Sequence, residues 1–540
     1  MKLNDRELQD REVWHRAGIT LPRFDRARMI RRTRERPAWV HFGAGNIFRA
    51  FPAALQQDLL DAGAAETGIV AAEGYDGEII RKIYRPHDDL SLLVTLKSDG
   101  SIGKRVIGSV AESLAADGSA PGDFKRLKAI FAGPSLQMAS FTITEKGYRL
   151  TRADGSLLPD VARDFEAGPE SPKSYLGRVM ALVYARFRAG RLPLALVSMD
   201  NCSHNGDRLR DAAFRFAREW TGRGLADAGF PDYLADREKI SFPWSMIDKI
   251  TPRPDAEVSR MLNGCGFEDT ETVVTEKHTY CAPFVNSEEA QYLVVEDWFP
   301  NGRPPLEKSG VIFTSRETVD KTEKMKVGTC LNPLHTALAV FGCLLCYTRI
   351  CDEMKDADLR RLAEGIGVRE GMPAVVSPGI LDPEAFLREV LEVRLPNPFL
   401  PDTPQRIATD TSQKLSVRFG GTIRAYCSRS DLDIRNLRLI PLVLAGWCRY
   451  LLGVDDAGKP FAVSPDPLYE SLSARLKGIR LGGKGPFHEA LAPILSDARI
   501  FGIDLYRAGL GGTVERDLGL LTAGPGAVRR TLHASVAEEK

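Results

Sequence analysis

The stretch EKMKVGTCLNPLHTAL, residues 323–338, holds a lysine, an asparagine and a histidine close together. Removing a hydride from an alcohol requires a base for the hydroxyl proton and donors for the oxygen as it gains charge. Lys326 could be that base in its neutral form, which burial and neighbouring positive charge favour, and Asn332 and His335 could donate to the oxygen. The pattern indicates alcohol oxidation. The alternative is that Lys326 is a surface lysine, Asn332 a helix cap and His335 a hydrogen-bonded core histidine.

A helix start must position these three residues. Asn332 followed by Pro333 is typical of an N-cap with proline at the first helical position, and the apolar run after them predicts a helix over 336–347. We therefore expect His335 in the first helical turn. Lys326 lies on a preceding segment that can fold back towards the same end.

A second site is predicted where a glycine turn follows a short apolar strand at 38–42. A helical pattern at 48–62 and a strand at 68–72 complete a βαβ unit, in which such a turn brings backbone N–H groups to a pyrophosphate. The full motif lacks its third glycine because Phe48 stands there, so an ordinary strand-to-helix turn is the alternative. The predicted cofactor contacts in this turn are Gly43, Gly45, Asn46, Ile47, Phe48 and Arg49.

Acidic residues after the second strand bear on which nicotinamide nucleotide binds. A carboxylate there would hydrogen-bond the ribose of NAD and repel the 2′-phosphate of NADP. Glu73, Asp76 and Glu78 are the candidates, which favours NAD over NADP, with solvated loop charges as the alternative. Thr144 and Glu145, after a strand predicted at 136–143, are further candidate cofactor contacts.

Strands and helices alternate in the first half of the chain and helices dominate the second. A further strand at 194–199 and helices at 178–187 and 209–220 predict a parallel, doubly wound sheet. The turn-rich segment at 299–305 predicts a domain boundary. We expect an α/β protein with a lead-in at 1–36, a Rossmann-type dinucleotide-binding domain at 37–305 and a mostly α-helical domain at 306–540, with the cleft between them as the default small-molecule site. Helices are predicted in the last domain at 336–347, 356–364, 383–393, 440–452 and 467–476.

Composition argues against several classes of partner. Lys and Arg (73) nearly balance Asp and Glu (72), so nothing favours a nucleic acid or a membrane surface. The N-terminus lacks the apolar core of a signal peptide, and the most apolar stretch, 338–347, is about half the length of a membrane span. Nine scattered cysteines form no disulfide framework, and Cys343 and Cys346 have no second pair that would suit zinc. We expect a cytoplasmic, metal-free monomer or weak homo-oligomer.

Seven stretches occur in order along the chain: HFGAGNIFRAF (41–51), SFTITEKGY (140–148), SMDNCSHNG (198–206), FPWSMIDKITP (242–252), APFVNSEEAQYLVVEDWFPNGRPPLEKSGVIFT (282–314), KMKVGTCLNPLHTAL (324–338) and NPFLPDTPQRIATDTSQK (397–414). Together they resemble the polyol-specific long-chain dehydrogenases, the mannitol dehydrogenase family of mannitol 2-dehydrogenase and fructuronate reductase (mannonate oxidoreductase). The resemblance implies a Rossmann-type domain, a helical C-terminal domain, a nicotinamide cofactor, no metal and a lysine as general base.

The resemblance also implies roles, position by position. Lys326 resembles the general base, Asn201 and Asn332 the asparagines that hold the reacting oxygen, and His335 a substrate-binding histidine. Without the resemblance, each has an ordinary structural explanation as a surface charge, a cap or a paired side chain. The remaining implied residues are Asp248, an active-site aspartate, Glu323, a carboxylate that gates proton release, and Arg406 and Lys414, which would contact the far end of the substrate.

This chain departs from the family pattern at two points. Five residues separate Lys326 from Asn332, whereas the family usually has four, and we place the extra residue between Gly328 and Leu331. Pro333 and Leu334 replace a small Gly-Ser pair, which would reshape the substrate pocket.

The run from Ser412 to Arg418 looks closer to the fructuronate reductases. We therefore favour a sugar acid, with D-mannonate and D-fructuronate as the best interpretation. A polyol such as mannitol or arabinitol is the alternative substrate. A catalytically silent protein that binds a nucleotide or a sugar is the alternative from another class.

Overall fold

The computed structural model describes residues 1–152, 154–483 and 485–537, in two compact units. The first unit comprises Met1–Lys97 and Ser101–Asp320, and the second comprises Ser98–Gly100 and the chain from Lys321 onwards. The lead-in at 1–36 packs within the first unit. That unit also runs past the turn-rich segment at 299–305, because strand β14 (Ile312–Thr314) pairs with β13 (Tyr292–Glu296).

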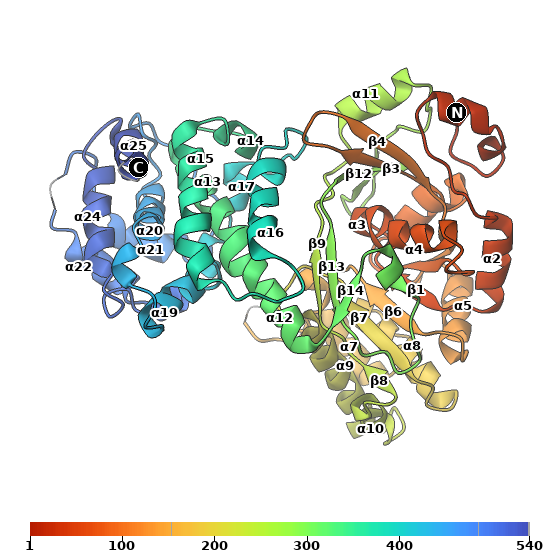
Figure 1. The fold of residues 1–540 in the computed structure, drawn as a ribbon. Coiled ribbons are helices and arrows are strands. Elements are labelled where there is room, and N and C mark those ends of the chain that lie inside the picture. Colours follow the sequence, from red (N-terminus) through yellow and green to blue (C-terminus); the bar gives the residue numbers. More distant parts are fainter. Residues whose placement is uncertain (153, 484, 538–540) are drawn as a thin grey trace. The chain divides into compact units, whose positions relative to one another are not determined.

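Six parallel strands form the central sheet of the first unit, in the order β5-β2-β1-β6-β7-β8 (Figure 1). The chain builds outward from β1 in both directions, which confirms the predicted Rossmann-type, doubly wound sheet. In such sheets ligands bind beyond the carboxyl ends of the strands, where the strand order reverses. The strands are β1 (Trp39–Phe42), β2 (Ile69–Glu73), β5 (Val110–Ala115), β6 (Met138–Phe141), β7 (Leu194–Ser198) and β8 (Ile240–Ser241).

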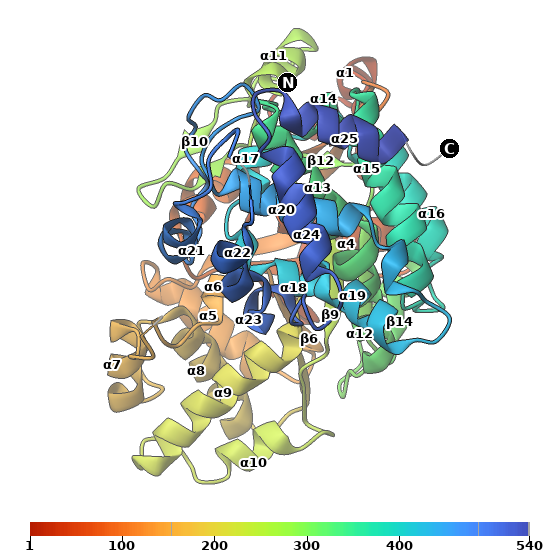
Figure 2. The ribbon, with the colours of Figure 1, turned by 90° about the vertical axis from the view of Figure 1, so that its left-hand side faces the viewer.

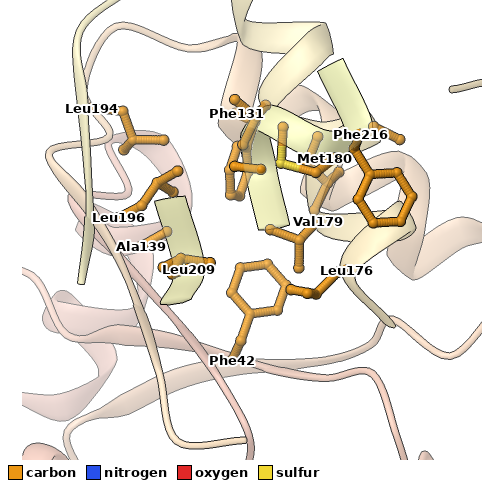
Figure 3. Close-up of a cluster of buried hydrophobic side chains, with 14 of the residues drawn as sticks. Phe42, Phe131, Ala139, Leu176, Val179, Met180, Leu194, Leu196, Leu209 and Phe216 are labelled. Carbon is orange, nitrogen blue, oxygen red and sulfur yellow. The ribbon is translucent and has the colours of Figure 1, made fainter. Parts of the chain in front are cut away.

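Both faces of this sheet are buried, as the continuous apolar strands require. Because side chains alternate between the faces, Val40 and Phe42 of β1 enter one cluster, and Trp39 enters the other. In the first cluster the Phe42 ring lies 6.1 Å from the ring of Phe131 on helix α5 (Pro121–Ala132), and Leu176 and Met180 of α8 (Tyr175–Arg188) belong to the same cluster (Figure 3). The two packed layers fix the strand ends from which the cofactor site is built.

The helix predicted at 48–62 is broken in two. Helix α3 (Asn46–Ala50) ends at Phe51, whose backbone lies outside the helical region, and α4 (Pro52–Asp61) starts at the next residue. Pro52 has no N–H to donate and restricts the residue before it, which explains the break. The other helices of this unit are α1 (Arg11–Arg16), α2 (Arg26–Glu35), α6 (Thr144–Gly147), α7 (Pro159–Ala167), α9 (Asn205–Gly222), α10 (Phe230–Ala235) and α11 (Ala256–Gly264).

Two small three-stranded sheets were not predicted. One has the order β12-β3-β4 and the other the order β14-β13-β9. Val285 of the edge strand β12 and Val295 of the middle strand β13 join the core cluster on the Trp39 side of the central sheet. The remaining strands are β3 (Ser91–Leu96), β4 (Ile102–Ile107), β9 (Ser245–Asp248), β10 (Val273–Val274), β11 (Tyr280–Cys281) and β12 (Phe284–Glu288).

The second unit is helical, as predicted. Helix α13 (Asn332–Leu344) is buried and packs against α15 (Ala357–Glu364) and α20 (Leu439–Tyr450), and α20 also packs against α24 (Gly511–Leu521) (Figure 2). The other helices are α12 (Arg316–Met325, which begins in the first unit), α14 (Ile350–Glu353), α16 (Pro383–Glu389), α17 (Pro404–Ile407), α18 (Leu415–Arg418), α19 (Gly420–Ser428), α21 (Tyr469–Leu476), α22 (His488–Leu495), α23 (Ala498–Phe501) and α25 (Ala527–Ala537).

One helical run, Arg316–Leu344, is long and apolar enough to cross a membrane by length and composition. However, 78% of its most apolar window is buried inside the protein, which is the burial of a core helix.

Candidate active site

A cavity of about 730 Å³ lies at the carboxyl ends of β1, β2 and β6 in the first unit. This is the point at which the strand order reverses, where a doubly wound sheet binds a nucleotide. Of the residues predicted to contact a cofactor, those that line the cavity are Gly43, Gly45, Glu73, Asp76 and Thr144.

The two glycines have different tasks. Gly43 has φ +102°, and a Cβ at this position would lie 2.2 Å from the carbonyl oxygen of Thr142, so only glycine fits. A Cβ on Gly45 would meet no protein atom within 4 Å. Gly43 therefore shapes the turn, whereas the space beside Gly45 lets a bound group approach the backbone, as a pyrophosphate would require.

Glu73 ends β2 and holds the glycine turn in place. Its carboxylate accepts backbone hydrogen bonds from Ala44 at 2.8 Å, Tyr75 at 2.7 Å and Asp76 at 3.0 Å. Burial raises the pKa of Glu73, although these three N–H groups oppose the rise. Asp76, which also lines the cavity, accepts a hydrogen bond from the Thr275 hydroxyl at 2.6 Å. Two acidic side chains thus border the cavity at the end of the second strand.

The other predicted cofactor contacts do not line this cavity. Phe48 is buried under the turn, and Arg49 is buried with its guanidinium donating to the Ala282 carbonyl at 2.6 Å and to Asn46 Oδ1 at 2.8 Å. Ile47 packs against the core cluster on the same side.

Two acidic side chains predicted to contact the cofactor are engaged elsewhere. Glu78 forms an ion pair with Lys82 at 2.9 Å and accepts the Glu276 backbone N–H, also at 2.9 Å. Glu145 forms an ion pair with Arg208 at 3.1 Å.

The apolar wall of the cavity was not predicted from the sequence. Ile143, Leu150, Leu158, Val161 and Leu176 line it, and they come from the segment after β6 through the start of α8. A wall of this kind suits a flat aromatic base. The rule that ligands bind beyond the strand ends could have pointed to the loop after β6, but its apolar residues read as ordinary core.

The SMDNCSHNG stretch is anchored at the end of β7. Asp200 accepts the backbone N–H groups of Ile143 and Thr144 at 2.9 and 2.8 Å and the Tyr148 hydroxyl at 2.6 Å. Asn201, the next residue, is exposed. Asp200 therefore ties the loop after β6 to the strand that presents Asn201. Asp248 ends β9 and is buried.

In the second unit, Lys326 is 2% exposed, whereas Lys324 is exposed. Lys326 begins a π-helical turn, η5 (Lys326–Cys330), closed by a hydrogen bond from the Leu331 N–H to the Lys326 carbonyl at 3.0 Å. A π-turn holds one residue more than an α-turn. The extra residue between Lys326 and Asn332 is therefore absorbed in place, and helical structure continues on both sides of it.

Asn332 is the first residue of α13 and not its N-cap, which is Leu331. The predicted cap is wrong because the π-turn leads directly into α13, so the chain enters already helical. His335 lies in the first turn as predicted, since its N–H donates to the Leu331 carbonyl at 3.1 Å. Glu323 lies on α12 in the turn before Lys326.

The His335 side chain is 17% exposed and its Nε2 lies 3.8 Å from Asp402 Oδ2. Burial, the largest effect, lowers its pKa to about 4 against the opposing charge of Asp402. Arg406, on α17, pairs with the same carboxylate of Asp402. Lys414 donates to the Thr409 carbonyl, and burial and the positive charge of Arg418 lower its pKa. The structure thus gathers His335 and Arg406 around one carboxylate, whereas Lys414 is bound to a backbone carbonyl.

Both units match known family models. Residues 37–308 match the mannitol dehydrogenase Rossmann domain, and residues 318–514 match the mannitol dehydrogenase C-terminal domain. The chain belongs to the mannitol dehydrogenase family. It is therefore an oxidoreductase, and the resemblance drawn from the seven sequence stretches is confirmed.

Relatives in this family match over nearly the whole chain. A D-mannonate oxidoreductase of Thermotoga maritima is 53% identical over 100% of both chains. A mannitol 2-dehydrogenase of Emericella nidulans is 30% identical over 94% of this chain and 93% of its own. Mannitol 2-dehydrogenase of Pseudomonas fluorescens, solved as a ternary complex with NAD and D-mannitol, superposes with a TM-score of 0.72 at 27% identity, covering 100% of both chains.

Proposed function

We propose that this protein is an NAD-dependent dehydrogenase that interconverts D-mannonate and D-fructuronate. The observation that carries the chemical assignment is the buried Lys326, placed by the π-turn directly before Asn332 and His335. Support for the substrate comes from the D-mannonate oxidoreductase that is 53% identical over its full length. Mannitol is the second candidate, because mannitol 2-dehydrogenases are about 30% identical over most of the chain.

Lys326 acts as the general base in this proposal. The buried amine accepts the proton of the substrate hydroxyl. Asn201 and Asn332 donate to the oxygen as it gains negative charge, and Asp248 binds the substrate beside Asn201. Glu323, one turn before Lys326, passes the proton on to solvent.

His335 binds the substrate in its neutral form. Because its pKa is about 4, the imidazole is uncharged near neutral pH and offers one donor and one acceptor to hydroxyl groups. Arg406 and Lys414 contact the far end of the substrate.

The cavity at Gly43 and Gly45 fits a dinucleotide, because Gly45 leaves open space beside the backbone and the apolar wall suits adenine. The bound nicotinamide would accept the hydride from the alcohol carbon and return it to the ketone. Glu73 and Asp76 favour the ribose of NAD over the phosphate of NADP. NADP is the second candidate, because Lys146 and Arg149 line the same cavity. The ratio of kcat/KM for NAD to that for NADP distinguishes the two.

Lys326→Ala tests the mechanism, and Lys324→Ala, two residues away on the same helical run, is its matched control. Lys326→Ala should lower kcat with D-mannonate by about 10³-fold and leave the Kd for NADH, followed by its fluorescence, within about threefold. Lys324→Ala should retain wild-type kcat. Wild-type turnover by Lys326→Ala would remove the lysine from the mechanism. A panel of D-mannonate, D-mannitol, D-arabinitol and D-altronate tests the substrate, and no turnover of any would favour a silent binding protein.

We further propose a cytoplasmic protein that acts as a monomer or weak homo-oligomer on a small molecule, with no nucleic-acid or membrane partner. The support is compositional: the net charge is +1, and all nine cysteines are free. Gel filtration across a range of protein concentrations tests the oligomeric state.

A further inference from the structure

Positive side chains outnumber negative ones around His335. Arg394, Arg406 and Arg418 all lower the pKa of His335, and Asp402 raises it. These arginines come from three separate elements: the end of the π-turn η8 (Val390–Arg394), α17 and the end of α18. Asp402 is already shared between His335 and Arg406. Among the described residues, Asp402 therefore forms no ion pair with Arg418.

Among the described residues, the Arg418 guanidinium makes a single side-chain hydrogen bond. Its guanidinium donates to the Thr336 hydroxyl, and Thr336 in turn donates to the Asn332 carbonyl at 2.9 Å. Arg418 is thereby tied to the residue next to His335 and to the helix start that presents Asn332. Across residues 1–152, 154–483 and 485–537, no carboxylate lies within 4 Å of it and no second hydrogen bond forms.

A partly buried guanidinium with one hydrogen bond is costly, because a charge taken out of water needs a counter-charge or several acceptors. Burial lowers the pKa of Arg418 to about 10. Lys414, four residues earlier, is another cation, and Arg418 lowers its pKa further. The two side chains repel each other, so an anion bound between their charged ends would relieve both costs.

We propose that Arg418 is a specificity-determining residue that receives the carboxylate of the sugar-acid substrate, assisted by Lys414. The planar guanidinium offers two parallel N–H groups that match a carboxylate, which a neutral polyol lacks. This assignment rests on the proposed sugar-acid dehydrogenase activity. Arg418 would thus distinguish sugar acids from polyols. Arg406 is less suited to this task because it already forms an ion pair with Asp402.

The test compares Arg418→Met, which removes the charge at similar length, with Arg418→Lys, which keeps the charge and loses the fork. Arg424→Met is the matched control, since Arg424 on α19 also donates to a single oxygen, the Gly502 carbonyl at 3.0 Å, and is exposed. Arg418→Met should raise the KM for D-mannonate about 100-fold with kcat changed less than about fivefold. Arg418→Lys should recover about tenfold of that loss, and Arg424→Met should match wild type.

D-Mannitol, which has the hydroxyl chain without the carboxylate, is measured as a substrate or as an inhibitor of D-mannonate oxidation. Its KM or inhibition constant should stay within about threefold of wild type in Arg418→Met. Equal weakening of both compounds, or an unchanged KM for D-mannonate, overturns the assignment. Wild-type enzyme without activity on D-mannonate would instead refute the proposed function. The melting temperature of each variant separates a folding defect from either result.

Discussion

Two histidines, one in each unit, both have a pKa lowered by burial and differ in their contacts. His41 on β1 is fully buried, with Nδ1 at 2.6 Å from the Ser140 hydroxyl, Nε2 at 2.8 Å from the Thr142 hydroxyl and the ring stacked on Phe48 at 4.2 Å. Burial lowers its pKa to about 3. Both ring nitrogens are satisfied, so His41 supports the glycine turn from below.

His335 has the same low pKa and a different surrounding. In the part of the chain that the structure describes, its ring makes no hydrogen bond, and its Nε2 lies 3.8 Å from Asp402 Oδ2, too long for one. Its ring is slightly exposed and adjoins the arginine-rich group described above. Burial and a lowered pKa therefore do not identify a functional histidine. A functional histidine is identified instead by ring nitrogens that form no hydrogen bond within the protein and so can bind a ligand.

The largest expected effect comes from replacing each histidine by glutamine. His335→Gln should lower kcat/KM for D-mannonate about 100-fold, because a positioned donor is lost, and should change the free energy of unfolding by less than about 1 kcal/mol. His41→Gln should lower the free energy of unfolding by about 1–3 kcal/mol through lost buried hydrogen bonds, and keep kcat within a few fold at saturating NAD. Urea titrations and initial rates check both. The reverse pattern would refute the comparison.

The second effect concerns the turn above His41. Gly43→Ala should destabilise the fold by about 2 kcal/mol and weaken NADH binding, because the Cβ collides with the Thr142 carbonyl and φ is positive. Gly45→Ala is the matched variant: it should keep the wild-type melting temperature and weaken NADH binding about tenfold, because its Cβ enters the open space. Equal loss of stability in both variants would show that Gly45, like Gly43, is required for the conformation of the turn.

The cofactor region was predictable from sequence because its signals are local. A strand, a glycine turn and a helix start occur within one short segment, and the apolar strand at 38–42 placed the turn directly after a strand. The predictions that failed in this region also concern local features. Pro52 splits the predicted helix, and the sequence could not show which acidic residue near 73–78 lines the cofactor site until Glu73 was seen bound to the turn.

The second unit was predictable only through resemblance. An α-turn and a π-turn have the same apolar pattern, so no sequence rule shows that the residue added after Lys326 closes a wider turn. Lys324 and Lys326 differ in burial, which the packing of the helix decides. Arg418 was named only as the end of the run from Ser412, with no role of its own, because its shortage of partners is a property of three-dimensional packing.

The smallest expected effect concerns Glu353 on α14, which tests whether unsatisfied hydrogen-bonding capacity alone identifies a functional residue. Both carboxyl oxygens are buried and, among the described residues, have no hydrogen-bond partner, and a Cβ on Gly342 of α13 would lie 2.1 Å from Oε1. By the criterion drawn from the histidines this group would be functional. Burial, however, raises its pKa well above the ordinary value of 4.5, so the folded protein holds it as a neutral acid in an apolar setting.

Because the folded pKa is raised, the stability linked to this proton is complete below pH 4.5 and is lost as the pH rises through the folded pKa. Wild-type protein should therefore lose unfolding free energy between pH 5 and pH 8. Glu353→Gln, neutral at every pH, should flatten that slope and be more stable than wild type by about 1 kcal/mol at pH 8, with kcat/KM unchanged. A tenfold loss of kcat/KM would instead place Glu353 in the site. An unchanged kcat/KM would mean that unsatisfied hydrogen-bonding capacity identifies a functional residue only where the group adjoins other ligand-binding side chains, as His335 and Arg418 do.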